Sequence, residues 1–407
     1  MTEASRILSE ATAQQERISG DRRFLHAHAE TRFDLNDTLP YVRSALEELG
    51  IEPKPCGKAG LTATVGGKRP GKVFLLRADM DALPIGEQAE VPFRCDSGNM
   101  HACGHDMHTA MLLGAARILK AHEEEIPGTV KLMFQPAEET FEGSLDMLND
   151  GLLENPAPDA ALMIHVMAGM PFAAGTVVVS APGVSAPAAD YFEIRVQGKG
   201  CHGSAPNLGV DPLNAAAHLV IALQEIHARE LAMTESAALT IGTFRAGTAA
   251  NAIPDEAVLG GTLRTYDEET RAFIKQRIGE IAEGTAKTFR CTATVTYTSG
   301  APTLKNDAAL SEAAFRYATE LLGPKQAFSV QQLSAMGGGG SKSAGSEDFA
   351  YVSQRIPAIM LALAAGNPAQ GYAYPGHHPM VRFDEAALAP GSAVYAYCAL
   401  RWLEEHA

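Results

Sequence analysis

Two patterns of apolar positions alternate over the first half of the chain. Helical spacing predicts helices over residues 3–19 and 34–49, and Gly50 is a stop signal for the second. Short continuous apolar runs predict three buried strands, at residues 72–77, 130–134 and 160–164. A helix rich in Ala, Leu and Met is predicted at His108–Lys120, between the first two strands. This order favours an α/β domain.

The pattern changes at about Val184. From there the sequence predicts a strand-helix-strand-strand-helix-strand unit, with strands at 190–197, 237–244, 256–264 and 292–297 and helices at 211–229 and 267–287. Such a unit is a compact α+β domain that can be inserted into a larger one. Further patterns at 310–322, 358–363 and 385–402 complete the first domain. At 407 residues, we predict a catalytic domain over 1–183 and 298–407 and an insert over 184–297.

Polar residues follow each predicted strand of the first domain. They are Asp79 and Asp81 after the first strand, Glu138 and Glu139 after the second, and His165 at the end of the third. In open α/β sheets, ligands bind just beyond the carboxyl ends of the strands. The sequence therefore predicts that these side chains meet at one edge of the sheet.

Cys103 and His105 stand in the loop that leads into the helix at 108–120. A thiolate near neutral pH needs an electropositive neighbour, and a divalent ion bound beside it supplies one. A late segment of the chain adds two more imidazoles, His377 and His378. Cys and His favour zinc or a similar transition metal, whereas carboxylates also suit manganese, so residue type does not fix the ion.

Taken singly, the histidines are weak evidence for a metal. Five of them are interpreted as surface or core residues: His101, His108, His122, His218 and His227. It is the coincidence of Cys103, His105, a glutamate pair and His165 near strand ends that indicates a metal site.

The adjacent Glu138 and Glu139 are expected to have different roles, because two neighbouring side chains cannot both bind one ion without strain. One is expected to bind the metal. The other can take a proton from water that the ion has acidified and pass it to a leaving amine. The alternative is a solvated acidic pair attracted to the start of a helix.

Composition excludes other functions. The net charge of −15 and the pI of about 5.3 disfavour binding to nucleic acid or to an anionic membrane. No signal-peptide pattern or long apolar run occurs, so a cytoplasmic protein with six free cysteines is expected. The glycine-rich patch Met336–Ser343 is predicted to be a flexible loop. It does not match a phosphate-binding loop, because Ser341 rather than Gly precedes Lys342.

Motifs spread over nearly the whole chain resemble those of one family. They are Arg23–His26, Arg77–Ile85, Met100–Asp106, Phe134–Glu139, His165, Gly198–His202, Asn251–Pro254, Gly261–Arg264, Ser346–Phe349 and His377–Pro379. In order and spacing the chain resembles the di-metal aminoacylase/carboxypeptidase amidohydrolases. The similarity is to the branch that contains hippurate hydrolase and indole-acetyl-amino-acid hydrolases. Asp79 where many members have His, and Cys103 where they bridge the metals through Asp, are features of that branch.

The resemblance implies a fold, a cofactor and roles for residues. The fold is α/β, with a mixed central sheet flanked by helices and an inserted ferredoxin-like dimerisation domain. Two divalent ions, zinc or manganese before nickel or cobalt, are held by Cys103, His105, Glu139, His165 and His377. Relatives have their last ligand two residues before the Pro, which selects His377 over His378. Glu138 is the general base, Asp81 orients the site, and Asp79 has no assigned role.

The resemblance also implies contributions from a partner subunit. His202 stabilises the oxyanion in the partner's active site, while Asn251 and Arg264 bind the substrate carboxylate. The expected activity is hydrolysis of the amide bond of an N-acyl amino acid through a metal-bound water, in a homodimer or a tetramer. The alternatives are a dipeptidase or carboxypeptidase of the same family, and a catalytically silent metal-binding protein.

Overall fold

The computed structural model describes residues 2–335 and 345–407, and the chain folds into two compact units. The larger comprises the chain up to Ser185 and the segments that begin at Lys305 and Asp348. The smaller comprises mainly Ala186–Leu304. The role of an insert at 184–297 as a dimerisation domain stays a prediction, and the glycine-rich patch Met336–Ser343 lies outside the described residues.

The larger unit is built on an eight-stranded mixed sheet with the order β1-β2-β4-β3-β5-β16-β6-β15. The strands are β1 (Lys54–Cys56), β2 (Gly60–Gly66), β3 (Arg69–Asp79), β4 (Pro127–Gln135), β5 (Ala160–Met167), β6 (Val177–Val179), β15 (Ala327–Ser329) and β16 (Ala358–Ala364). β3 runs parallel to both β4 and β5, and β5 runs parallel to β16. The three strands predicted to bear the site therefore end at the same edge, as expected.

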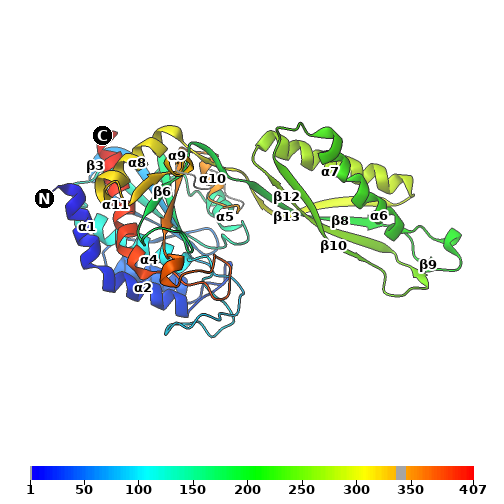
Figure 1. Cartoon of the computed structure of the whole chain (residues 1–407), viewed down its shortest axis with the longest axis horizontal. Helices are drawn as coiled ribbons and strands as arrows, with labels where there is room; N and C mark the ends of the chain where they lie inside the picture. The colour runs from blue at the N-terminus through cyan, green and yellow to red at the C-terminus, as the bar shows by residue number, and fades with distance from the viewer. Residues whose placement is uncertain (1, 336–344) are drawn as a thin grey trace. The chain divides into compact units, whose positions relative to one another are not determined.

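Helices cover this sheet (Figure 1). They are α1 (Glu3–Ala13), α2 (Gln15–Ala27), α3 (Thr38–Glu47), α4 (His105–Ala121), α5 (Gly143–Asn149), α8 (Ala308–Leu322), α9 (Val330–Ala335), α10 (Ala350–Ser353) and α11 (Leu388–Glu405). α4 and α11 pack on each other and are buried along nearly their whole length, which their apolar composition explains. The single helix predicted over residues 3–19 is wrong, because the chain breaks at Gln14 into α1 and α2.

The smaller unit contains a four-stranded antiparallel sheet with the order β10-β12-β8-β13. Its elements are β8 (Ala188–Gln197), α6 (Pro212–Ala222), β10 (Ala237–Ala246), β12 (Glu256–Thr265), α7 (Glu268–Thr288) and β13 (Thr292–Ala301). Both helices pack on one face of the sheet (Figure 1). On the two central strands, alternate apolar residues are buried: Phe192, Ile194 and Val196 of β8 and Ala257, Leu259 and Leu263 of β12. The helix predicted over 211–229 ends early, at Ala222, and a π-helical turn follows at Ile226–Glu230.

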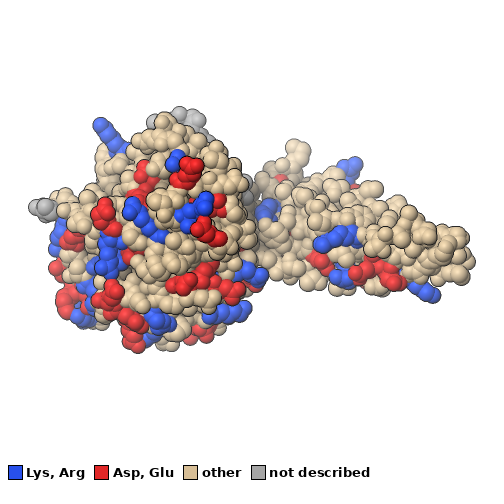
Figure 2. All heavy atoms as spheres, turned by 90° about the horizontal axis from the view of Figure 1, so that it is seen from below, with Lys and Arg blue, Asp and Glu red and all other residues tan. Residues whose placement is uncertain are grey.

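Two short pairs complete the description. β9 (Cys201–His202) pairs with β11 (Ala252–Ile253) at one end of the smaller unit (Figure 1). β7 (Gly183–Ala186) pairs with β14 (Leu304–Asn306). On the face seen in Figure 2, acidic and basic side chains are interspersed over the larger unit without a separate basic area. Within residues 2–335 and 345–407, no helix combines the length and apolarity needed to cross a bilayer.

Candidate metal centre

A glycine turns the chain from Cys103 directly into α4. Gly104 has a φ of +88°, and a Cβ there would lie 2.4 Å from the side chain of Val166. Only glycine fits that backbone conformation and that close approach. His105 consequently becomes the first residue of α4, one residue after the turn, rather than part of the preceding loop.

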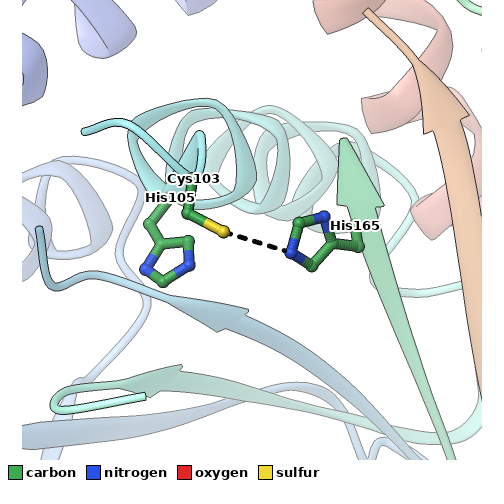
Figure 3. Close-up of side chains that lie close together, drawn as sticks. All are labelled: Cys103, His105 and His165. Carbon is green, nitrogen blue, oxygen red and sulfur yellow. Dashed lines mark hydrogen bonds between the residues drawn. The ribbon is translucent and has the colours of Figure 1, made fainter. Parts of the chain in front are cut away.

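The structure gathers the five predicted ligands at the edge of the sheet where β3, β4 and β5 end. Figure 3 shows the Cys103 thiol between the imidazoles of His105 and His165, with Sγ 3.5 Å from His165 Nε2. Glu139 Oε1 lies 3.8 Å from His105 Nε2 and 3.5 Å from His377 Nε2. Cys103, His105 and His165 form one group whose ligand atoms lie within 4.8 Å of one another, and Cys103, Glu139 and His377 form another.

His377 and His378 point to different partners. His377 donates its backbone N–H to Ala102 and has a φ of +66°, so its ring reaches Glu139. The ring of His378 stacks on Tyr374, and its Nδ1 accepts the backbone N–H of Met380. Of the two, His377 is therefore the imidazole that the fold brings to the cluster.

Backbone carbonyls orient the imidazoles of His105 and His165. His105 Nδ1 donates to the carbonyl of Asp81, and His165 Nδ1 donates to the carbonyl of Val166, both at 2.8 Å. Because each Nδ1 donates to a carbonyl, Nε2 is the nitrogen that each ring turns toward Cys103 and its neighbours. This is how proteins commonly orient a metal-binding histidine.

Asp81 fixes the position of the two glutamates. Its carboxylate accepts the backbone N–H groups of Glu138 at 3.0 Å and of Glu139 at 3.2 Å. The preceding residue, Ala137, has a φ of +50°, a conformation that the tight turn after β4 imposes. As a result both carboxylates face His105, with Glu138 Oε2 3.9 Å from His105 Nε2.

Burial shifts the pKa values of several groups in the cluster. Burial and then the charge of Glu139 raise the pKa of the Cys103 thiol to about 12. Burial also raises the pKa of Glu139 to about 7, while burial and His108 lower that of His165 to about 3. A bound divalent ion would favour the ionised thiol and carboxylate and the neutral imidazole.

Unpaired atoms provide an independent test of whether a metal fits. Among the described residues, His105 Nε2 and Glu139 Oε1 are buried without a hydrogen-bond partner although they lie only 3.8 Å apart. Buried polar atoms normally have partners, so two such atoms facing each other beside a thiol call for a ligand between them. The donor set of thiol, imidazole and carboxylate fits a transition metal.

Asp79 and His108 also lie close to His105, but their atoms are already engaged. His108 Nδ1 donates to Asp79 Oδ1 at 2.6 Å, and His108 Nε2 accepts the backbone N–H of Val166 at 2.8 Å. Sequence reasoning missed His108, which it took for a surface or core residue. The signal was its spacing: three residues after His105 on one helix, it shares that residue's face.

The residues predicted to bind substrate lie in the smaller unit. His202 on β9 is opposite Ala252 on β11, and the Asn251 carbonyl accepts the N–H of Gly203, so His202 and Asn251 are neighbours. Arg264 lies near the other end of β12, where it donates to the Tyr191 hydroxyl at 3.1 Å. From Glu256 to Arg264 the strand advances eight residues, or about 26 Å. The structure thus separates Arg264 from Asn251 within one chain.

Comparisons with known proteins point to one family of peptidases. The profile of peptidase family M20/M25/M40 matches residues 75–401. An N-acetyl-L-cysteine deacetylase of Bacillus subtilis is 34% identical, over 96% of this chain and 89% of that protein. An IAA-amino acid hydrolase of Arabidopsis thaliana is 36% identical, over 95% and 85%. The crystal structure of a dinuclear metal-binding M20 peptidase of Bacillus subtilis is similar with a TM-score of 0.77 at 33% identity, over 97% of this chain and 99% of that one.

Proposed function

The chain belongs to peptidase family M20/M25/M40 and is a metal-dependent amidohydrolase, and from this we propose that it hydrolyses the amide bond of N-acyl amino acids. The family predicted from the motifs is thereby confirmed. The observation that carries the proposal is the pair of carboxylates held by Asp81. Glu139 faces two imidazoles, whereas Glu138 Oε2 lies 3.9 Å from His105 Nε2, beside the same cluster.

The metal centre would hold two divalent ions. Of the candidate ligand groups, Cys103 links the one with His105 and His165 to the one with Glu139 and His377, so it is the residue that two ions would share among these five. We propose zinc or manganese, with nickel and cobalt as alternatives. When bound, such ions acidify a water molecule and polarise the acyl carbonyl.

Glu138 would then act as the proton carrier. Its carboxylate takes a proton from the attacking water and passes it to the nitrogen of the departing amine. Asp81 keeps Glu138 in place through the hydrogen bond to its backbone N–H. His202 is proposed to donate a hydrogen bond to the oxyanion that forms on the acyl carbon.

The positions of Arg264 and Asn251 support a homodimer. Because about 26 Å of β12 separates Arg264 from the end that carries Asn251, one chain cannot bring both to one substrate carboxylate. Two copies can, if Arg264 comes from one subunit and Asn251 with His202 from the other. The strand order β13-β8-β12-β10 with two helices on one face supports the ferredoxin-like dimerisation domain. β10 leaves an unpaired edge for a second copy, and a tetramer is the larger alternative.

Mixing two inactive variants tests this sharing of sites. His202→Ala and Glu138→Gln homodimers are each expected to be nearly inactive. A heterodimer of the two has one intact site, so co-expressed subunits that assort randomly should recover about a quarter of wild-type activity. Hydrolysis rates of the co-purified mixture measure this.

The matched control pairs Glu138→Gln with Cys103→Ala. Both changes lie in the larger unit, so each site of their heterodimer carries one defect and no activity should return. Recovery in the control mixture, or none in the His202 mixture, would contradict a partner's contribution.

The substrate's acyl group is proposed to be apolar and bulky. In the described part of the larger unit, the exposed large apolar side chains are Met167, Tyr374 and Met380. Each lies within three residues of His165 or His377, and Met167 points to the same face of β5 as His165 because the two are two residues apart. Methionine and tyrosine together form an adaptable apolar rim, which suits an aromatic acyl group.

A substrate panel tests the proposed function directly. Metal-stripped protein is reconstituted with zinc, manganese, cobalt or nickel and assayed on N-benzoyl amino acids, N-acetyl amino acids and dipeptides. We expect kcat/KM for the benzoyl substrates to exceed that for the acetyl ones by about 10-fold, because roughly 50 Å² more apolar surface becomes buried. Met167→Ser should remove much of this preference and leave acetyl substrates unaffected.

Other outcomes of the panel would favour the alternatives. Faster cleavage of dipeptides would indicate a dipeptidase or carboxypeptidase, and no turnover with any metal would indicate a silent metal-binding protein. A cytoplasmic location is proposed because all six cysteines are free thiols, which suits a reducing compartment.

A further inference from the structure

β5 extends beyond its neighbour β3 in the direction of the metal centre. The two strands pair from Phe74 opposite Ala160 as far as Arg77 opposite Met163. On its other side, β5 stays paired with β16 as far as Met167. The last residues of β5, which include His165, are therefore not paired with β3.

Two side chains accept the β5 N–H groups that β3 no longer pairs with. The Tyr395 hydroxyl accepts the N–H of Ile164 at 3.0 Å and donates to the Arg77 carbonyl at 2.7 Å. Two residues further along β5, His108 Nε2 accepts the N–H of Val166 at 2.8 Å. Alternate N–H groups of a strand point to the same side, so both bonds continue the ladder that β3 began.

His108 is itself anchored in the core. Because its Nε2 accepts a hydrogen bond, its Nδ1 carries the proton and donates to Asp79 Oδ1. Asp79 Oδ2 lies 2.7 Å from the Arg77 guanidinium. Arg77, Asp79 and His108 are all fully buried. A continuous chain of contacts therefore runs from Arg77 to the peptide bond that joins His165 and Val166.

We propose that His108 is a positioning residue for the metal centre: it holds the backbone at His165, and through it the Nε2 that faces Cys103 (Figure 3). The ring of His108 lies 4.8 Å from that of His165 and 5.4 Å from that of His105. Its two nitrogens are engaged elsewhere, so it orients a ligand without being one. This inference rests on the proposed function only in taking His165 for a metal ligand.

Substitution of His108 by Gln or by Asn tests its two ring nitrogens separately. Gln places its amide about where Nε2 lies and keeps the acceptor for Val166, whereas Asn reaches only as far as Nδ1 and keeps the link to Asp79. We expect His108→Asn to lower the affinity for one of two zinc ions by about 10- to 100-fold. His108→Gln should stay close to wild type. Titration of the metal-stripped proteins with zinc against a chromophoric chelator measures both.

Tyr395→Phe is the matched control. It removes the neighbouring ladder bond, to Ile164, so it should lower the midpoint of thermal unfolding and leave zinc affinity unchanged. The proposal is overturned if His108→Asn binds both ions as the wild type does, if Gln and Asn weaken binding equally, or if Tyr395→Phe weakens it as much. Zinc affinity is measured without substrate. If the variants show these zinc affinities but the wild-type protein hydrolyses none of the substrates, the proposed function is wrong and the role of His108 stands.

Discussion

Replacing Glu138 with Gln is expected to lower kcat by about 10²- to 10⁴-fold while both metal ions stay bound. The glutamine fills the same space but cannot take a proton from water. The backbone of residue 138 would still donate to Asp81 Oδ1, so the turn and Glu139 keep their positions. Turnover of an N-benzoyl amino acid and metal content by elemental analysis, on the same preparation, measure the two effects separately.

Glu142→Gln is the control for this change. Glu142 lies four residues further along, is partly exposed and pairs with Arg32 at 2.9 Å, away from the cluster. It should retain wild-type turnover. If Glu138→Gln kept more than about a tenth of the activity, proton transfer by this residue would be ruled out. If it instead lost an ion, Glu138 would be a ligand, and the division of labour with Glu139 would have to be reversed.

The gathering of the ligands could be predicted from the sequence because it follows from a small set of local rules. Apolar runs marked β3, β4 and β5, and parallel strands in one sheet must end at a common edge. The residues after those runs, Asp81, Glu138 and Glu139, had to meet there. His377 comes from a distant loop, so its place in the cluster could be expected only from the family resemblance.

The features that the sequence could not predict are those that depend on where helices and strands end. The break at Gln14 carries neither glycine nor proline, so the apolar spacing reads through it. The importance of His108 arises because β3 stops pairing with β5 at Arg77, while β5 continues to pair with β16 as far as Met167. The sequence marks Arg264 and Asn251 as substrate-binding candidates. It does not show that they lie at opposite ends of β12, because this depends on where the strand begins and ends.

Cys103→Ala is expected to abolish turnover and to lower metal affinity by more than about 100-fold. Loss of a residue that only orients a ligand lowers metal affinity by roughly 10- to 100-fold, and loss of the ligand itself should cost more. Cys103 links the group of His105 and His165 to the group of Glu139 and His377, so its loss affects both ions. Cys103→Asp restores an anionic ligand and should recover binding. Zinc titration and elemental analysis of the two variants beside the wild type give the comparison.

The pH dependence of binding distinguishes a thiolate ligand from a bystander. Because the pKa of the metal-free Cys103 thiol is raised to about 12, the thiol is protonated throughout the range from pH 6 to 8. An ion that binds the thiolate must release this proton, so affinity should rise by about tenfold per pH unit from this group. Glu139, with a pKa of about 7, adds a second released proton and a steeper slope below pH 7. A carboxyl group has a much lower intrinsic pKa than a thiol, so the Cys103→Asp variant should release fewer protons on binding and show a shallower slope toward pH 8. An unchanged slope in that variant would mean that the sulfur binds no metal.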